Sequence, residues 1–311
     1  MASSSCVFAP NLSLTVTLEK GGDNGSTEVH LHPGGQGFWV ARMLSHLGIA
    51  PSLCGPVGGE TGWVIASLLE RWGIEFCPIE ASNSSPAVLQ DRRGGERVII
   101  AEATGLSLDR HALDDAYSKF LDLALACDVA VLTGQTTEVV PEESYRRMAH
   151  DLASAGVRVV GDLHGPELGA LLDGGPVDIL KVSDEDLMSD GLLSDTTEES
   201  ALAAGSELQR RGAKGVVISR ADKPAVAYLG GLVLRATPTR LEPADFRGAG
   251  DSMTAGLTAG LARGLGPEQM LRLACGAGAA NVTRHGLGSG SEELIGKLAD
   301  RVEVEVLAHS L

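Results

Sequence analysis

The sequence predicts an α/β fold with a doubly wound, mostly parallel sheet, and two observations support this prediction. Apolar segments of strand length alternate with segments of helix length after the first third of the chain. Runs such as Val129-Ala130-Val131-Leu132 are apolar at every position, which suits strands covered by helices on both faces. The expected strands cover 128–133, 157–163, 177–182 and 215–219, and the expected helices include 141–155 and 198–211.

The first third of the chain departs from this alternation. Two segments alternate apolar and polar residues on either side of a glycine-containing turn, which is typical of β-hairpins with one solvated face. The segments are 12–18 with 26–31, and 87–90 with 97–101, and helices are expected at 38–47 and 62–72. We expect the hairpins to pair into a small sheet over about 12–33 and 85–103. This sheet would serve as a lid over a substrate cleft or as a dimerisation sheet.

Composition narrows the classes of function. The chain has 311 residues, 43% of them hydrophobic, 40 glycines and a net charge of −16. We treat residues 1–311 as a single domain with a large core. The negative charge argues against a nucleic-acid partner. The five cysteines are scattered along the chain, and this spacing indicates structural thiols. Neither a signal sequence nor an apolar run of about 18 residues is evident, so we expect a cytoplasmic protein without a membrane partner.

The segment 245–256, Asp-Phe-Arg-Gly-Ala-Gly-Asp-Ser-Met-Thr-Ala-Gly, is the most informative about chemistry. Glycines at a helix start allow an anion to approach free backbone N–H groups and the positive end of the helix dipole. A carboxylate at that position, Asp251, suggests a base that takes a proton from an alcohol while the N–H groups hold a phosphoryl group. A simple helix cap is the structural alternative.

Several motifs together resemble the ribokinase/PfkB family of carbohydrate kinases, in its phosphofructokinase-like branch. Gly34-Gly35-Gln36-Gly37-Phe38-Trp39-Val40-Ala41 resembles the family's N-terminal signature, and 245–251 resembles its C-terminal signature. Intermediate motifs fall at 55–62, 162–165 and 181–187. The resemblance implies a ribokinase-like three-layer α/β/α core with a small β-sheet lid, and it spans nearly the whole chain.

The resemblance also implies roles at the catalytic end of the cleft. Asp251 matches the family's base, and Gly248, Ala249 and Gly250 match its anion hole. ATP and Mg²⁺ are the implied cofactors, with Asp186 acting on the metal through water. A monovalent cation near Asp245 is a further possibility that the sequence leaves open.

Other matched positions concern the two substrates. Gly34 and Gly35 match glycines that lie against the sugar, and Arg97 resembles an arginine that holds a substrate phosphate in some members. Arg97 could equally be an exposed strand residue without a specific role. The implied nucleotide-site residues are Ser219, Lys223, Arg247, Asn281 and Gly286.

The residues expected to bind the phosphoryl acceptor depart from the family pattern. Thr15 stands where the family has its sugar-binding acid, Gln36 where members usually have Lys, and Trp39 where they have Asn. Trp39 could stack on a substrate ring or could be a core residue beside Phe38. Arg247 could contact a phosphoryl oxygen or bridge to a nearby acid.

The hypothesis that follows is an ATP-dependent kinase that phosphorylates an alcohol of a sugar or sugar phosphate. We expect a homodimer formed through the lid. The alternatives are a nucleoside kinase of the same family and a catalytically weak descendant that binds a metabolite as a sensor.

Overall fold

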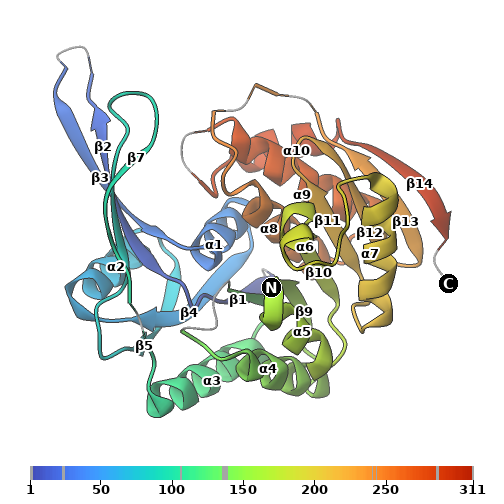
Figure 1. The fold of residues 1–311 in the computed structure, drawn as a ribbon, viewed down its shortest axis with the longest axis horizontal. Helices are drawn as coiled ribbons and strands as arrows, with labels where there is room; N and C mark the ends of the chain where they lie inside the picture. The colour runs from blue at the N-terminus through green and yellow to red at the C-terminus, as the bar shows by residue number, and fades with distance from the viewer. Residues whose placement is uncertain are drawn as a thin grey trace.

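The main sheet has ten strands and is mostly parallel, as predicted (Figure 1). The structure is a computed structural model, and it describes residues 3–22, 25–105, 107–134, 139–239, 241–242, 244–284 and 287–309. Seven strands run parallel, and three antiparallel strands extend one edge. In spatial order the strands are β14 (Glu303–His309), β13 (Leu232–Thr237), β12 (Lys223–Leu229), β11 (Val216–Arg220), β10 (Ile179–Ser183), β9 (Arg158–Asp162), β8 (Val129–Thr133), β1 (Ser4–Phe8), β4 (Ala50–Val57) and β5 (Glu75–Glu80).

Helices cover both faces of this sheet, which gives the three-layer arrangement that the resemblance implied. The continuous apolar strands explain the layering: Val129 and Val131 enter one core, and Ala130 and Leu132 enter the other. The first core is closed by α1 (Gln36–His46), α2 (Gly59–Arg71), α8 (Ala249–Ala262), α9 (Pro267–Val282) and α10 (Glu292–Ala299). The second is closed by α3 (Arg110–Leu125), α4 (Glu142–Ser154), α5 (Gly165–Gly174), α6 (Asp184–Ser189) and α7 (Glu198–Arg210).

The two hairpins form a separate four-stranded sheet that projects from the body of the molecule (Figure 1). Strand β2 pairs in parallel with β6, and the other two pairs are antiparallel. The strands lie in the order β3 (Thr27–Gly34), β2 (Ser13–Lys20), β6 (Ala87–Asp91) and β7 (Val98–Ala103). The pairing of hairpins predicted from alternation is therefore what the structure contains.

Helix α8 is held tightly against α9 because small residues face the contact. A Cβ atom added at Gly256 would lie 2.5 Å from the Cα of Ala274, a distance that only glycine permits. This packing fixes the direction in which the start of α8 points.

In the described part of the chain, no helix combines the length and apolar character needed to span a bilayer.

Candidate active site

The start of α8 provides a backbone anion site. Gly248 is its N-cap and adopts a left-handed conformation with φ 74°, which favours glycine. Since Gly248 has no side chain to cap the helix, the N–H groups of Ala249, Gly250 and Asp251 are left without a side-chain acceptor from the N-cap. The helix therefore presents three backbone donors and its positive dipole end at one point.

A buried ion pair lies directly against this turn. Lys181 on β10 donates to Asp162 at the end of β9, with 3.2 Å between Nζ and Oδ1. A Cβ at Gly250 would lie 2.7 Å from the Lys181 Nζ, so glycine is needed for the ammonium to approach the backbone. Thr254, one turn further along α8, donates to the other oxygen of Asp162 at 2.5 Å. These contacts tie two strand ends to the first turn of α8.

Asp251 completes a cluster of two carboxylates and one ammonium. It keeps some solvent-accessible surface, yet protein surrounds its carboxyl group. Desolvation, with a further contribution from Asp162, raises the pKa of Asp251 to about 7, and Lys181 opposes this rise. Burial alone would lower the pKa of Lys181, but Asp162 and Asp251 reverse that effect and raise it. The cluster therefore contains a charged lysine and a carboxyl group that titrates near neutrality.

Gln36 connects the same strand ends to the start of α1. Its amide nitrogen donates to the backbone oxygen of Asp162, and its amide oxygen accepts from the N–H of Gly134, both at 3.2 Å. Gln36 is thus a linking residue between β8, β9 and α1. The sequence comparison with the usual family lysine did not anticipate this role.

Asp245 is engaged by two arginines. Arg247 donates to it through the backbone N–H and Nε at 3.1 and 3.0 Å and through Nη2 at 2.5 Å. Arg92, in the turn of the lid hairpin, lies 3.7 Å away. Burial opposes ionisation, but the hydrogen bonds from Arg247 and the charge of Arg92 outweigh it and lower the pKa of Asp245. Of the two roles considered for Arg247, the structure contains the bridge to an acid.

Asn281 near the end of α9 holds the loop before α8. Its Nδ2 donates to the backbone oxygen of Arg247 at 2.6 Å, and its Oδ1 accepts from the N–H of Gly288 at 2.7 Å. Asn281 has no exposed surface, and these two hydrogen bonds hold the loop before α8. Its assignment to the nucleotide site stays a prediction. Gly286, the neighbouring expected nucleotide residue, lies outside the described residues.

The expected acceptor residues converge where β2, β3 and α1 meet. Thr15 is half-buried on β2, and a Cβ at Gly34 would lie 3.0 Å from its hydroxyl oxygen. Gly35 has φ 107° and caps α1, and a Cβ there would lie 2.2 Å from the backbone oxygen of Asn11. Both glycines are required by this close packing of the chain, whatever else they contact.

Trp39 is a core residue. Only 8% of its surface is exposed, and its ring lies 4.6 Å from that of Phe38 and 5.9 Å from that of His32. The structure therefore favours the core alternative, and contact with an acceptor is open only to the remaining exposed edge. The pKa of His32 falls to about 4, because of burial and then because of the charge of Arg42.

Arg97 lies just before β7 and is anchored within the lid. Its Nε donates to the amide oxygen of Gln90, and Gln90 donates to the Thr17 hydroxyl at 2.6 Å. Burial and the charge of Arg247 lower the pKa of Arg97, which places the two cations near each other. Arg92 and Arg247 both lie at Asp245, and the charges of Asp245 and Glu102 act on the nearby Arg97.

The remaining predicted residues lie along the carboxyl ends of the parallel strands. Ser183 caps α6 and donates to Asp186 at 2.5 Å. Ser219 donates weakly to the Val182 oxygen at 3.5 Å, and the Lys223 ammonium donates to the Thr196 hydroxyl at 2.8 Å. Carboxylate oxygen is a preferred Mg²⁺ donor, and Mg²⁺ commonly keeps its waters, so Asp186 fits water-mediated metal contact.

Comparison with known proteins identifies the family. The model of the pfkB family carbohydrate kinases matches residues 11–294. The chain belongs to this family. It is similar to the 1-phosphofructokinase of Bacillus subtilis, with 28% identity over 95% of this chain and 96% of the relative. It is 30% identical to the ATP-dependent 6-phosphofructokinase isozyme 2 of Mycobacterium tuberculosis over 80% of this chain and 73% of the relative.

A solved structure confirms the ribokinase-like fold. The phosphofructokinase-2 of Escherichia coli in complex with potassium superposes with a TM-score of 0.85, at 24% identity, over 97% of this chain and 99% of that one. As a pfkB family member of the phosphofructokinase-like branch, the protein is a carbohydrate kinase, and this confirms the class of enzyme predicted from the two glycine signatures.

Two charged residues of the site were not assigned a role by sequence analysis. Asp162 and Lys181 were recognised only as parts of intermediate motifs. A signal was available, because Lys181 lies between the apolar residues Leu180 and Val182 of β10 and a buried lysine requires a partner. Asp162 ends the neighbouring strand β9. Ligands of open α/β sheets bind at such carboxyl ends of strands.

The raised pKa of Asp251 predicts a pH-dependent effect of Asp251→Asn on stability. Because the pKa is higher in the folded state than the ordinary value of 3.8, this group contributes less stability as pH rises toward about 7. The neutral asparagine avoids this loss. We expect the melting temperature of the variant, relative to wild type, to increase between pH 5 and pH 8, by about 2–4 °C for each kcal/mol gained.

Thermal melts at closely spaced pH values measure this difference. The control is Asp222→Asn, the same chemical change at an exposed residue of the turn between β11 and β12. A difference between Asp251→Asn and wild type that is equal at pH 5 and pH 8 would contradict the raised pKa.

Proposed function

We propose that this kinase transfers the γ-phosphoryl group of ATP to a hydroxyl of a sugar phosphate, with Asp251 as general base. The observation that carries the proposal is a carboxyl group with a pKa of about 7 within the first turn of α8. A base that titrates near the working pH is suited to accept the proton of an alcohol. The backbone N–H groups of the same turn are suited to hold the transferring phosphoryl group.

Each element of the cluster has a part in this mechanism. Gly248, Ala249 and Gly250 hold the phosphoryl oxygens close to the attacking hydroxyl, so that the reaction depends on positioning and charge. Lys181 stabilises the ionised form of Asp251, which opposes the effect of burial. Asp186 would hold Mg²⁺ through water, and the metal would neutralise charge on the phosphates. Ser219 and Lys223, at the ends of adjacent strands, would line the nucleotide side.

A phosphorylated acceptor is favoured by the charges on the lid side. Arg92, Arg97 and Arg247 lie near one another, with Asp245 and Glu102 as the acids that act on them, so cations outnumber these carboxylates in this part of a strongly acidic protein. Guanidinium groups bind phosphate oxygens with directed hydrogen bonds. Thr15, Gly34 and Gly35 would contact the sugar, with Arg97 on its phosphate. The relatives named 1-phosphofructokinase and 6-phosphofructokinase are consistent with this class of acceptor.

A monovalent cation does not fit the Asp245 side chain as it lies. Arg247 occupies both carboxylate oxygens, and Arg92 adds further positive charge. The carboxylate therefore has no uncompensated charge to attract a cation. The similar phosphofructokinase-2 structure of Escherichia coli contains potassium. In this chain, the carboxylate of Asp245 offers no free charge for such a cation.

Turnover by Asp251→Asn tests the proposed base. Loss of a positioned base is expected to lower kcat by about 10²- to 10⁴-fold, while ATP binding stays close to wild type. Assays with Mg-ATP and fructose 1-phosphate, fructose 6-phosphate, fructose and nucleosides measure this effect and the acceptor class. Asp114→Asn, at an exposed position of α3, is the control. Equal turnover by Asp251→Asn would exclude Asp251 as the base, and preference for a nucleoside would contradict the sugar-phosphate assignment.

We further propose that two copies of the chain associate through the lid. Val29 and Leu31 share one face of β3, and through the pairing of β3 with β2 and β2 with β6 this face continues through Val16 and Leu18. The face is covered near its base by the first core but is exposed toward its tip, where 56% of Val29 is accessible. Exposed apolar surface of this kind is typical of protein interfaces. A second lid offers a matching apolar face.

Val29→Glu tests this assembly. A carboxylate on the apolar face is expected to convert a dimer into a monomer, because the charge would be buried without a partner. Sedimentation velocity at micromolar concentration measures the change. Leu125→Glu is the control, since Leu125 is 57% exposed but lies on α3 outside the lid. A wild-type monomer, or a dimer that survives Val29→Glu, would contradict the proposed interface.

A further inference from the structure

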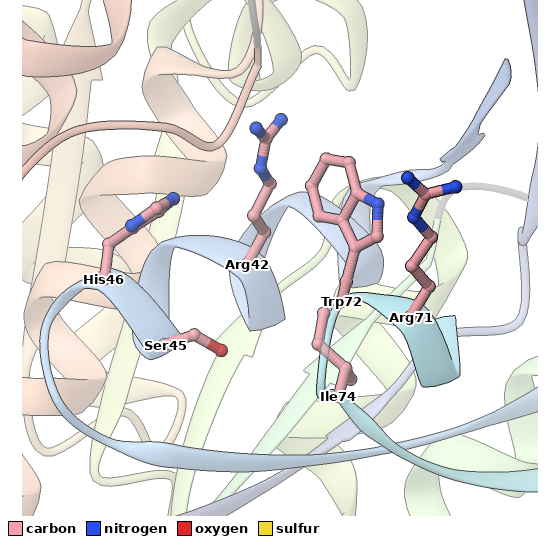
Figure 2. Close-up of a pocket in the computed structure, with 6 residues that line it drawn as sticks. All are labelled: Arg42, Ser45, His46, Arg71, Trp72 and Ile74. Atoms are coloured by element: carbon pink, nitrogen blue, oxygen red, sulfur yellow. The ribbon is translucent and has the colours of Figure 1, made fainter. Parts of the chain in front are cut away.

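A basic pocket lies between the C-terminal ends of α1 and α2, and its lining includes none of the residues that form the candidate active site. The pocket has a volume of about 320 Å³, at the small end of the range for small-molecule sites. Figure 2 shows the side chains of Arg42, His46, Arg71 and Trp72 projecting toward the same side. The lining residues are Arg42, Ser45, His46, Arg71, Trp72 and Ile74.

The charge of this pocket is opposite to that of the protein. Two arginines line it, while the chain as a whole carries a net charge of −16. The imidazole of His46 adds a polar group and not a charge, because burial and the charges of Arg42 and Arg284 lower its pKa. Within the residues that the structure describes, neither Arg42 nor Arg71 has a carboxylate at ion-pair distance. Arg284 adds a further positive charge near Arg42 and His46. Unneutralised cations that converge on a cavity favour an anionic ligand.

Arg42 is held in place for such a contact. Its guanidinium lies 4.1 Å from the centre of the Trp72 ring, and its Nη1 donates to the backbone oxygen of Leu287 at 2.7 Å. Its Nε is buried and has no hydrogen-bond partner among the described residues. Because the Nε is closed off by protein, Arg42 offers an anion the fixed positive charge of its guanidinium and not this donor. Burial and Arg284 lower the pKa of Arg42 to about 10.

The second arginine is free to complete the contact. Arg71 is exposed at the end of α2, and Figure 2 shows it beside Trp72, on the side of the ring away from Arg42. His46 lies beyond Arg42 on α1. Two guanidiniums on either side of an indole, with an imidazole nearby, give the pocket positive charge from two directions.

We propose that this pocket binds the phosphoryl group of a small phosphorylated metabolite. A phosphoryl group carries more charge than a single carboxylate, and guanidinium groups hold its oxygens with directed hydrogen bonds. The site is separate from the backbone anion site at the start of α8. It does not depend on the identity of the acceptor in the proposed reaction.

Calorimetric titration with magnesium-free pyrophosphate tests the proposal. The wild-type protein is expected to show a binding component that Arg71→Gln weakens about tenfold, the loss expected for one charged hydrogen-bonding group. His46→Gln is expected to weaken the same component. Any binding at the start of α8 would be unchanged in both variants, so the component that responds to Arg71→Gln belongs to the pocket.

Arg110→Gln is the matched control, because Arg110 is an exposed arginine on α3 and its loss changes the net charge equally. It should bind pyrophosphate as wild type does. Because Arg71 lies outside the proposed catalytic machinery, Arg71→Gln should retain wild-type kinase turnover and melting temperature. Equal pyrophosphate affinity and stoichiometry in wild type, Arg71→Gln and His46→Gln would overturn the proposal, as would weakening by Arg110→Gln to the same extent.

Discussion

The ion pair between Lys181 and Asp162 is the interaction on which the catalytic cluster depends. Both residues are buried, and a lysine placed there without a carboxylate would carry an unpaired charge in the protein interior. Loss of one partner of a buried pair typically destabilises a protein by about 3–5 kcal/mol. Here Lys181 also packs against the backbone of Gly250, and Asp162 accepts a hydrogen bond from the Thr254 hydroxyl. The pair therefore fixes the first turn of α8 relative to the sheet.

The same pair sets the protonation of Asp251 by two opposing effects. Asp162 disfavours a second negative charge nearby, whereas Lys181 favours it. Burial adds to the effect of Asp162, and the balance leaves a carboxyl group that can exist in either state near neutral pH. The proposed anion site and the proposed base are therefore neighbours in one helical turn, and the buried pair contacts this turn.

The catalytic loop is connected to the rest of the molecule on two sides. The side chain of Asn281 donates a hydrogen bond to the backbone oxygen of Arg247. Arg92 links the lid to Asp245 through an ion pair. Arg42 reaches the Leu287 oxygen next to Gly288, whose N–H donates to Asn281. The loop that precedes α8 is thus braced by residues distant in sequence, which suits a site that must hold a phosphoryl group in a defined position.

The fold and the position of the site followed from sequence patterns that are local. Alternation in residues 12–33 predicted the lid strands, continuous apolar runs predicted the parallel sheet, and the glycines before Asp251 predicted an accessible helix start. The role of Lys181 was not predicted, because its partners lie on another strand and another helix and only the folded chain brings them together. The structural role of Asn281 was not predicted for the same reason, since sequence position alone does not show that its amide holds the backbone of Arg247 and Gly288.

The central claim is that Lys181 keeps the pKa of Asp251 close to neutrality, so that Asp251 can act as the base of the reaction. The pH dependence of kcat/KM in wild type and in Lys181→Met tests it most directly, because this ratio reports ionisations of the free enzyme. We predict that kcat/KM in wild type decreases as the pH is lowered through a midpoint of about 7, because Asp251 becomes protonated. In Lys181→Met the midpoint should lie at a higher pH. A folded Lys181→Met enzyme with an unchanged or lower midpoint would contradict the account.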